Sequence, residues 1–258
     1  MYKKLGEYME NTVFNELGLE KLAPKGLKWS EQSITDDEYL NKKKGILNVK
    51  GYGLYDENKE NRYCLFIDLP KDNEKETLTA LLMNPANTFP PEIAKMKNVK
   101  PRFDQTIRNL IMLANAVGYK HVIVLNAFPY IEGDSTRANK YYKKHKDDTD
   151  FQEKQNLNFA IVKTIMEKNK ELLVACGDSV SDELYKKYLG IIKANNNKSL
   201  TLYTYANEDI KKDTESYTAL TAKGRPRHLS TQSKYNREHY ILAIKNKKLY
   251  ELKIKELE

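Results

Sequence analysis

Short apolar runs, each long enough for one strand and too short for a buried helix, recur along the chain and predict its strands. They cover residues 62–69, 78–83, 121–125, 172–176 and 200–205. A polar turn at 71–75 separates the first two runs, which indicates a hairpin. The second run stops at Asn84, because the Pro85 that follows cannot continue a central strand.

Between these runs the apolar residues change to helical spacing. The clearest case predicts a helix over 105–117, with Asp104 as its N-cap and Gly118 at its end. Two more helices are predicted, over 151–168 and from a cap at Asp178 or Ser179 to about residue 194. The segment from Asn126 to about residue 150 is long and polar.

The alternation of strands and helices is typical of a three-layer αβα fold with a mainly parallel central sheet. We expect this α/β core domain to cover residues 59–237. Residues 1–58 are expected to form an N-terminal extension, helical over 1–28 and irregular over 29–50. A C-terminal extension, 238–258, is expected to pack on the core as a hairpin, although a helix also fits its pattern.

Composition supports a globular protein with a substantial core. A length of 258 residues suits one α/β domain with additions. No apolar run approaches the roughly 20 residues that a membrane span needs. The first residues contain no apolar signal segment, so we expect a cytoplasmic protein without membrane contact. Cys64 and Cys176 lie far apart inside apolar runs and are expected to be buried, reduced thiols.

Several common catalytic motifs are absent from the sequence. It contains neither of the two common Gly-rich loops that bind phosphates, no Gly-x-Ser-x-Gly elbow and no His-Glu-x-x-His motif. The segment Cys176-Gly177-Asp178-Ser179 resembles a nucleophile motif, but no base is paired with it. We therefore expect neither a metal nor a cofactor.

The net charge of +8 is concentrated in three basic stretches. Residues 95–108 carry +4, and residues 137–146 and 223–237 carry +5 each, so the rest of the chain is net acidic. Each stretch follows a predicted strand, and loops at the carboxyl ends of parallel strands share one rim. We therefore expect all three to line one crevice and to contact a polyanion, with DNA as the first expectation. The predicted nucleic-acid contacts are Arg102, Arg108, Arg137, Lys140, Lys143, Lys144, Arg225 and Arg227.

Four residues at strand ends and in a late loop are candidates for chemistry: Asn84, Asn126, Gly177 and His228. An asparagine amide can orient a water or pair with the edge of a nucleobase. Histidine can stabilise a developing anion as a neutral donor or balance a phosphate as a cation. Glycine allows a close backbone approach.

Structural explanations of the same residues remain open. An asparagine after a strand is often a turn former, and His228 can be an ordinary surface residue. The basic stretch at 137–146 can be a solvated helix face, because acidic residues follow it directly.

Four motifs in order resemble an uncharacterised bacterial and phage family, domain of unknown function 1643. They are Leu81-Leu82-Met83-Asn84-Pro85-Ala86, Asp104-Gln105-Thr106-Ile107-Arg108, the segment from Gly118-Tyr119 to Val122-Ile123-Val124-Leu125-Asn126-Ala127-Phe128, and Gly224-Arg225-Pro226-Arg227-His228. The likeness covers about residues 60–235 and implies no activity by itself.

The same strand ends are similar, more distantly, to the uracil-DNA glycosylase superfamily. That resemblance implies a uracil-DNA-glycosylase-like fold in which Asn84 positions the attacking water and Asn126 reads a flipped base. It also gives His228, in a His-x-Ser loop with Ser230, a catalytic role. An aromatic side chain, Phe103 or Phe89, with Phe128 as a further candidate, would stack on the base.

Three functions are compatible with these observations. The first is an N-glycosyl hydrolase that releases a modified base from DNA after flipping it, with Asn84 and His228 as catalytic residues. The second is a non-catalytic module for nucleic acids or nucleotides, because Leu82 and Ala86 stand where the related motif has glycines. The third is an enzyme acting on free nucleotides. The base, the strand state and the oligomeric state are not predicted.

Overall fold

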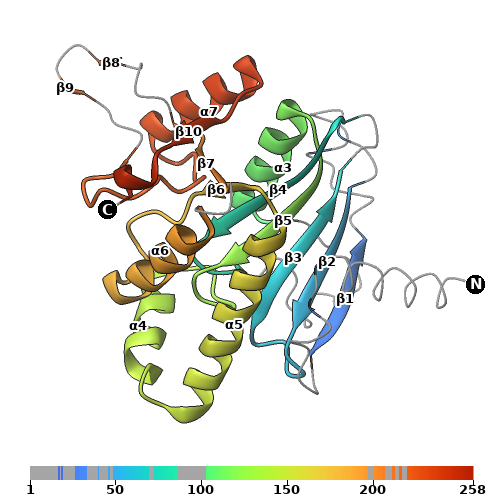
Figure 1. The fold of residues 1–258 in the computed structure, drawn as a ribbon, viewed down its shortest axis with the longest axis vertical. Helices are drawn as coiled ribbons and strands as arrows, with labels where there is room; N and C mark the ends of the chain where they lie inside the picture. Colours follow the sequence, from blue (N-terminus) through green and yellow to red (C-terminus); the bar gives the residue numbers. More distant parts are fainter. Residues whose placement is uncertain are drawn as a thin grey trace, which may run out of the picture.

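The structure is a computed structural model that describes most of the predicted core (Figure 1). It describes residues 49–69, 73–86, 103–196, 200–206, 211–212, 215–216 and 220–257, together with 17, 19, 27–33, 40 and 46. The strands are β1 (Lys28–Ser33), β2 (Lys50–Tyr55), β3 (Arg62–Asp68), β4 (Lys75–Leu82), β5 (Tyr119–Asn126), β6 (Glu171–Val174), β7 (Thr201–Thr204), β8 (Lys211–Lys212), β9 (Glu215–Ser216) and β10 (Tyr250–Leu252). The helices are α3 (Gln105–Val117), α4 (Ser135–His145), α5 (Thr149–Lys168), α6 (Asp182–Asn196), α7 (Lys234–Asn246) and the short 3-10 helix η2 (Ile254–Glu256).

The main sheet is mixed, with a parallel centre and antiparallel edges. In the described part of the chain its order is β1-β2-β3-β5-β4-β6-β7-β10. The strands β5, β4, β6 and β7 pair in parallel, whereas β1, β2 and β3 on one side and β10 on the other pair antiparallel. The general α/β class is confirmed, but the prediction of a mainly parallel sheet holds only for the centre.

Helices cover both faces of this sheet (Figure 1). One face packs on α3 and α7 through Leu82, Leu110 and Tyr240. The opposite face packs on α4, α5 and α6 through a second cluster that includes Leu81 and Ile161. Neighbouring residues of β4 therefore enter different cores, which is why a central strand needs a continuous apolar run instead of alternation.

The predicted hairpin of residues 62–69 and 78–83 is wrong. β5 lies between β3 and β4, antiparallel to the first and parallel to the second. An apolar run that is buried on both faces shows that a strand is central but carries no information about its neighbour. The link between β3 and β4 therefore spans the width of one strand, and Leu69 and Lys75 donate backbone hydrogen bonds to Lys120 and Gly118.

The ends of α3 agree with the prediction. The Asp104 side chain accepts a hydrogen bond of 3.0 Å from the Ile107 amide. Gly118 ends the helix in the left-handed region, with φ of 96°. Both signals are local to the sequence, which explains why they could be read from it.

The start of α6 differs from the prediction. The Ser181 hydroxyl accepts the hydrogen bond from the Leu184 amide, so the cap is Ser181 and not Asp178 or Ser179. Three polar residues with cap-forming side chains precede this helix, and tertiary contacts decide which of them takes the position. Asp178 and Ser179 remain in the turn between β6 and α6.

The polar segment after Asn126 contains a helix of its own. α4 starts after Asp134, whose carboxylate accepts a hydrogen bond of 2.9 Å from the Arg137 amide. The basic stretch at 137–146 therefore lies mostly on a helix, as the structural explanation of this stretch assumed. α4 escapes a search for apolar periodicity because only Ala138 and Tyr142 of its residues are buried.

Both chain extensions contribute strands to the main sheet. Within 29–50, predicted to be irregular, β1 pairs antiparallel with β2. The tail combines the two conformations considered for it: α7 is followed by β10, which pairs with β7 and not with a partner in the tail. Edge strands are short and polar, so their sequences lack the apolar run that identified the central strands. Most of residues 1–28, predicted to be helical, lie outside the described residues.

Candidate functional site

A cavity of about 380 Å³ lies at the carboxyl ends of the central parallel strands. From β4 the chain first adds β5 on one side and later adds β6 on the other, so the strand order reverses beside β4. Such a reversal opens a crevice that is the usual ligand site of α/β sheets. The polar residues that line the cavity are Arg62, Asn84, Asp104, Thr106, Asn126, Glu132, Ser135, Asp178, Ser179, His228, Ser230 and Gln232.

Asn126, at the end of β5, is the most unusual residue of this cavity. Its side chain is fully buried, with 0% exposed surface, and neither its Oδ1 nor its Nδ2 atom has a hydrogen-bond partner among the described residues. A buried polar group without a partner costs about 1–3 kcal/mol, and such groups are rare in native structures. An amide that lines a cavity in this state offers one donor and one acceptor to a ligand.

Buried polar groups behind β5 hold the backbone of Asn126 in place. The Asn158 amide on α5 donates a hydrogen bond of 2.8 Å to the Asn126 carbonyl, and Gln155 donates one of 3.1 Å to the Ala127 carbonyl. Both amides also donate to the Tyr188 hydroxyl. Burial raises the pKa of this tyrosine far above its ordinary value, so its hydroxyl stays neutral.

Asn84, just after β4, also faces the cavity, but only one end of its amide is available. Its Nδ2 atom donates to the Glu132 carbonyl and, at 3.4 Å, to the Pro85 carbonyl. A carbonyl oxygen only accepts hydrogen bonds, so these contacts fix the orientation of the amide. The Oδ1 atom of Asn84 is therefore the end that can accept a hydrogen bond from a water or a ligand.

His228 lies in the loop before α7 and belongs to the lining of the cavity. The Ser230 amide donates a hydrogen bond of 3.2 Å to Nδ1, so the neutral ring carries its proton on Nε2. Burial lowers the pKa of His228, and the negative charge of Asp104 opposes this shift only in part. Of the two roles predicted for this histidine, the geometry favours the neutral donor over the phosphate-binding cation.

Gly177 allows the His228 loop to pack against the end of β6. Its φ of +68° is a conformation that other residues adopt at a cost, and an added Cβ would lie 3.0 Å from the His228 Cβ. The Gly177 amide donates a hydrogen bond of 3.0 Å to the Pro226 carbonyl. The close approach predicted for this glycine is therefore to its own chain.

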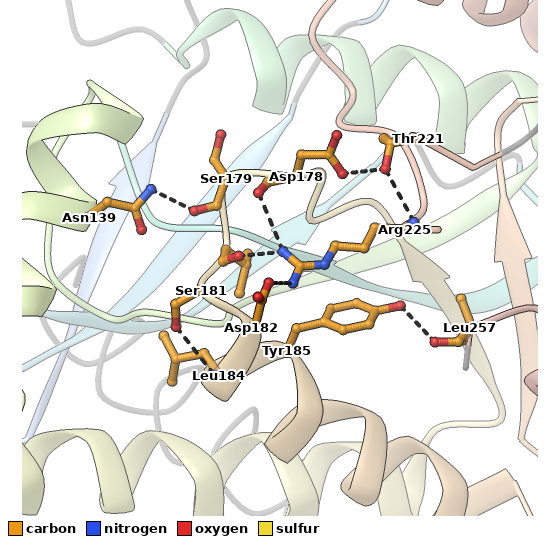
Figure 2. A network of polar contacts seen from close by, with 11 residues as sticks. Asn139, Asp178, Ser179, Ser181, Asp182, Leu184, Tyr185, Thr221, Arg225 and Leu257 are labelled. Atoms are coloured by element: carbon orange, nitrogen blue, oxygen red, sulfur yellow. Dashed lines mark hydrogen bonds and ion pairs between the residues drawn. The ribbon is translucent and has the colours of Figure 1, made fainter. Parts of the chain in front are cut away.

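Arg225 anchors the turn between β6 and α6, as Figure 2 shows. Its side chain is only 4% exposed and donates to the carbonyls of Asp178 and Val180 and to the Asp182 carboxylate. The guanidinium also lies over the Tyr185 ring, 4.5 Å from its centre. The buried guanidinium is thus directed at the protein itself, although the sequence suggested a nucleic-acid contact.

The cavity is richer in acids than the charge pattern suggested. Among the described residues, three carboxylates, Asp104, Glu132 and Asp178, line it together with one cation, Arg62, which is 1% exposed. A hydrogen bond from Arg137 lowers the pKa of Glu132, which keeps this carboxylate ionised at neutral pH. Asp178 accepts a hydrogen bond from the Thr221 hydroxyl.

The basic stretches reach the cavity, but their described lysines and arginines do not line it. Arg137 is paired with Glu132, and Arg227 lies 4.1 Å above the Tyr235 ring. Arg108 lies half-buried on α3. Lys140, Lys143 and Lys144 are exposed along α4. The expectation of one basic crevice is thus not met within the described residues, and Arg102 lies outside them.

The aromatic candidates are not in the described lining either. Phe103 is buried in the core beneath α3, and Phe128 packs among Tyr130, Tyr142 and Phe151. Phe89 lies outside the described residues. Stacking on a base by either described phenylalanine would need it to leave its present core position.

Sequence reasoning missed Arg62, Glu132 and Asp178 as cavity residues. A charged residue at the head of an apolar run, such as Arg62, is a signal that could have been used. Glu132 had no such signal, because its place depends on the loop that leaves β5. Cys176 also lines the cavity, but burial raises the pKa of its thiol to about 12, which argues against a thiolate nucleophile.

Neither a metal site nor a membrane span is found in the part of the chain that the structure describes. No cluster of three His, Cys, Asp or Glu side chains there is arranged to hold a metal ion. No described helix combines the length and the apolar character that crossing a membrane requires.

Comparisons with known proteins place the chain in a family without giving it an activity. No curated protein matches the sequence. Among solved structures, a CE15 glucuronoyl esterase from Teredinibacter turnerae T7901 aligns with 11% identity and a TM-score of 0.24. That alignment covers 67% of this chain and 52% of the esterase, so the chain spans about half the length of that protein. A family model described as a protein of unknown function, DUF1643, matches residues 62–228, which include every strand end of the cavity; the chain belongs to this family.

Proposed function

We propose that the protein hydrolyses the N-glycosidic bond of a nucleobase that is held in the cavity. The observation that carries this proposal is the unsatisfied, fully buried amide of Asn126 in the same cavity as Asn84 and His228. An amide edge with one donor and one acceptor is complementary to the edge of a nucleobase. A ligand that makes both bonds would recover the cost of leaving the amide unpaired.

Asn84 and His228 supply the polarity that the reaction needs. The acceptor Oδ1 of Asn84 can orient a water toward the sugar C1′ atom. The Nε2–H group of His228 can donate to the departing base as it gains negative charge. The C1′–N bond breaks with its electron pair on the base, the water oxygen bonds to C1′, and a proton from the water ends on the base.

The next question is whether the base belongs to DNA or to a free nucleoside. The likeness to the uracil-DNA glycosylase superfamily supports DNA, as do the exposed lysines of α4. The acids of the described lining instead favour another candidate, an enzyme that acts on free nucleosides. A non-catalytic binding module would keep the contacts of Asn126 without turnover.

The test is a panel of substrates scored for base release. Oligonucleotides with uracil, mismatched or modified bases and a set of free nucleosides would be incubated with the full chain. We expect release from at least one substrate, a loss of about 100-fold or more with Asn84→Ala, and little change with Asn156→Ala, an exposed amide on α5. Absence of release from every substrate would rule out the proposed hydrolysis.

A further inference from the structure

Helices begin close to the cavity at three places. Thr106 and Ile107 of α3 and Ser135 of α4 belong to the lining, and Asp178 and Ser179 precede α6. Helix N-termini at the ends of parallel strands are the usual phosphate sites of α/β proteins, because free amides and the helix dipole attract anions.

In this protein a side chain of the chain itself already occupies each of these termini. Asp104 accepts from the Ile107 amide at 3.0 Å, Asp134 from the Arg137 amide at 2.9 Å, and Ser181 from the Leu184 amide at 3.3 Å. Two of these caps are carboxylates, which neutralise the dipole. A phosphate at α3 or α4 would have to displace a negative charge that is already bound.

The charges of the cavity wall also disfavour a phosphate. The described lining holds the carboxylates Asp104, Glu132 and Asp178 and the cation Arg62. Arg137, outside the lining, neutralises Glu132, so these described charges leave a formal excess of one negative charge. The fully buried amide of Asn126, with both polar atoms unsatisfied, independently indicates that a polar ligand enters the same cavity.

We infer that the cavity accepts the uncharged part of its substrate, a nucleobase with its sugar, and excludes phosphate. This inference rests on the proposed function for the identity of the ligand. The carboxylates would stabilise positive charge that develops on the sugar as the glycosidic bond lengthens. A free nucleoside therefore fits better than its 5′-monophosphate, and a polymer would keep its phosphates outside the cavity.

The test compares ligands that differ only in phosphate. Binding of adenosine, guanosine, cytidine, uridine, thymidine and their 5′-monophosphates to the full chain would be measured by calorimetry, with inorganic phosphate as a competitor. We expect at least one nucleoside to bind about tenfold more tightly than its monophosphate, because like charges in a cavity repel. Inorganic phosphate should not displace it.

Two isosteric variants test whether the carboxylates cause this preference. Asp178→Asn and Glu132→Gln should each reduce the discrimination against the monophosphate, whereas Asp147→Asn, an exposed residue of another region, should leave it unchanged. Should one cavity variant fail to fold, the other still decides. Equal or tighter binding of the monophosphates, displacement by phosphate, or no binding of any nucleoside would overturn the inference.

The results that would overturn the proposed hydrolysis differ from those that would overturn the phosphate exclusion. Base release from a nucleoside 5′-monophosphate in preference to its nucleoside would overturn the phosphate exclusion and keep the hydrolysis. Preferential nucleoside binding without base release from any substrate would overturn the hydrolysis and keep the phosphate exclusion.

Discussion

Two groups of polar contacts, each built around one buried side chain, meet at the turn after β6 and differ in their hydrogen bonding. In the Arg225 network, made of Arg225, Asp178, Val180, Asp182 and Thr221, the guanidinium is bound to acceptors of its own chain (Figure 2). In the cavity, Asn126 is equally buried, and its side chain has no hydrogen-bond partner within the part of the chain that the structure describes. Burial alone thus does not distinguish a structural polar group from a binding one; the presence of partners does.

The largest effect on stability is expected from a substitution in the Arg225 network. Arg225→Met removes a buried guanidinium and leaves the Asp178 and Val180 carbonyls without their donor. We expect the free energy of unfolding to fall by about 3 kcal/mol. Urea denaturation would measure this, with Arg237→Met, an exposed residue of α7, as the control. A loss similar to that of the control would show that the network is not structural.

Asn158 and Asn126 test this contrast directly, because the Asn158 side chain donates a hydrogen bond to the Asn126 backbone carbonyl. Asn158→Leu removes the donor to the Asn126 carbonyl and to Tyr188, and we expect a loss of about 1–2 kcal/mol. Asn126→Leu removes an amide without partners, and we expect unchanged or higher stability, by up to about 1 kcal/mol.

Ligand binding should respond in the reverse order. Asn126→Leu should abolish binding of any nucleoside that the wild type binds, and Asn158→Leu should only weaken it, because it acts through the backbone of Asn126. Calorimetry and urea denaturation on both variants would check this. Equal losses of stability would mean that Asn126 is structural.

Gly177 connects the two groups, since its turn leads into the Arg225 network and its backbone touches the His228 loop. Gly177→Ala forces a side chain into a conformation with φ of +68° and against the His228 Cβ. We expect a loss of about 1–2 kcal/mol. The variant Gly133→Ala is a matched control, because nothing lies within 4 Å of its added Cβ. Equal stability of the two variants would contradict the close approach.

The sequence predicted those parts of the molecule that depend on local signals. The central strands, the caps of α3 and the strand-end positions of Asn84 and Asn126 all follow from apolar runs, Pro85 and cap residues. The neighbours of β3 and the strand at 28–33 did not, because pairing is set by tertiary contacts that leave no periodic mark.

The same holds for the candidate site: its residues at strand ends were predicted, but the charge of its lining was not. Asn84, Asn126, Gly177, His228 and Ser230 were named from the sequence and lie together around one cavity. Its acid-rich lining was not foreseen, because a count of charges along the chain does not show which way side chains point. Arg225 and Arg137 raise the charge of their stretches, yet both are bound to acids of the same chain.

The smallest effect at neutral pH is expected from His228, which has a partner for one ring nitrogen only among its described contacts. Burial lowers its pKa below the ordinary value of 6.5, so in acid the unfolded chain takes up a proton that the folded chain does not. Stability therefore falls as the pH drops below about 6.5. His239, with a pKa lowered to about 4, acts in the same direction.

His228→Asn keeps an acceptor for the Ser230 amide but does not titrate. We expect nearly wild-type stability at pH 7.5 and a shallower loss between pH 6.5 and 4 in urea denaturation; parallel curves for the two proteins would show that His228 is not held neutral by the fold.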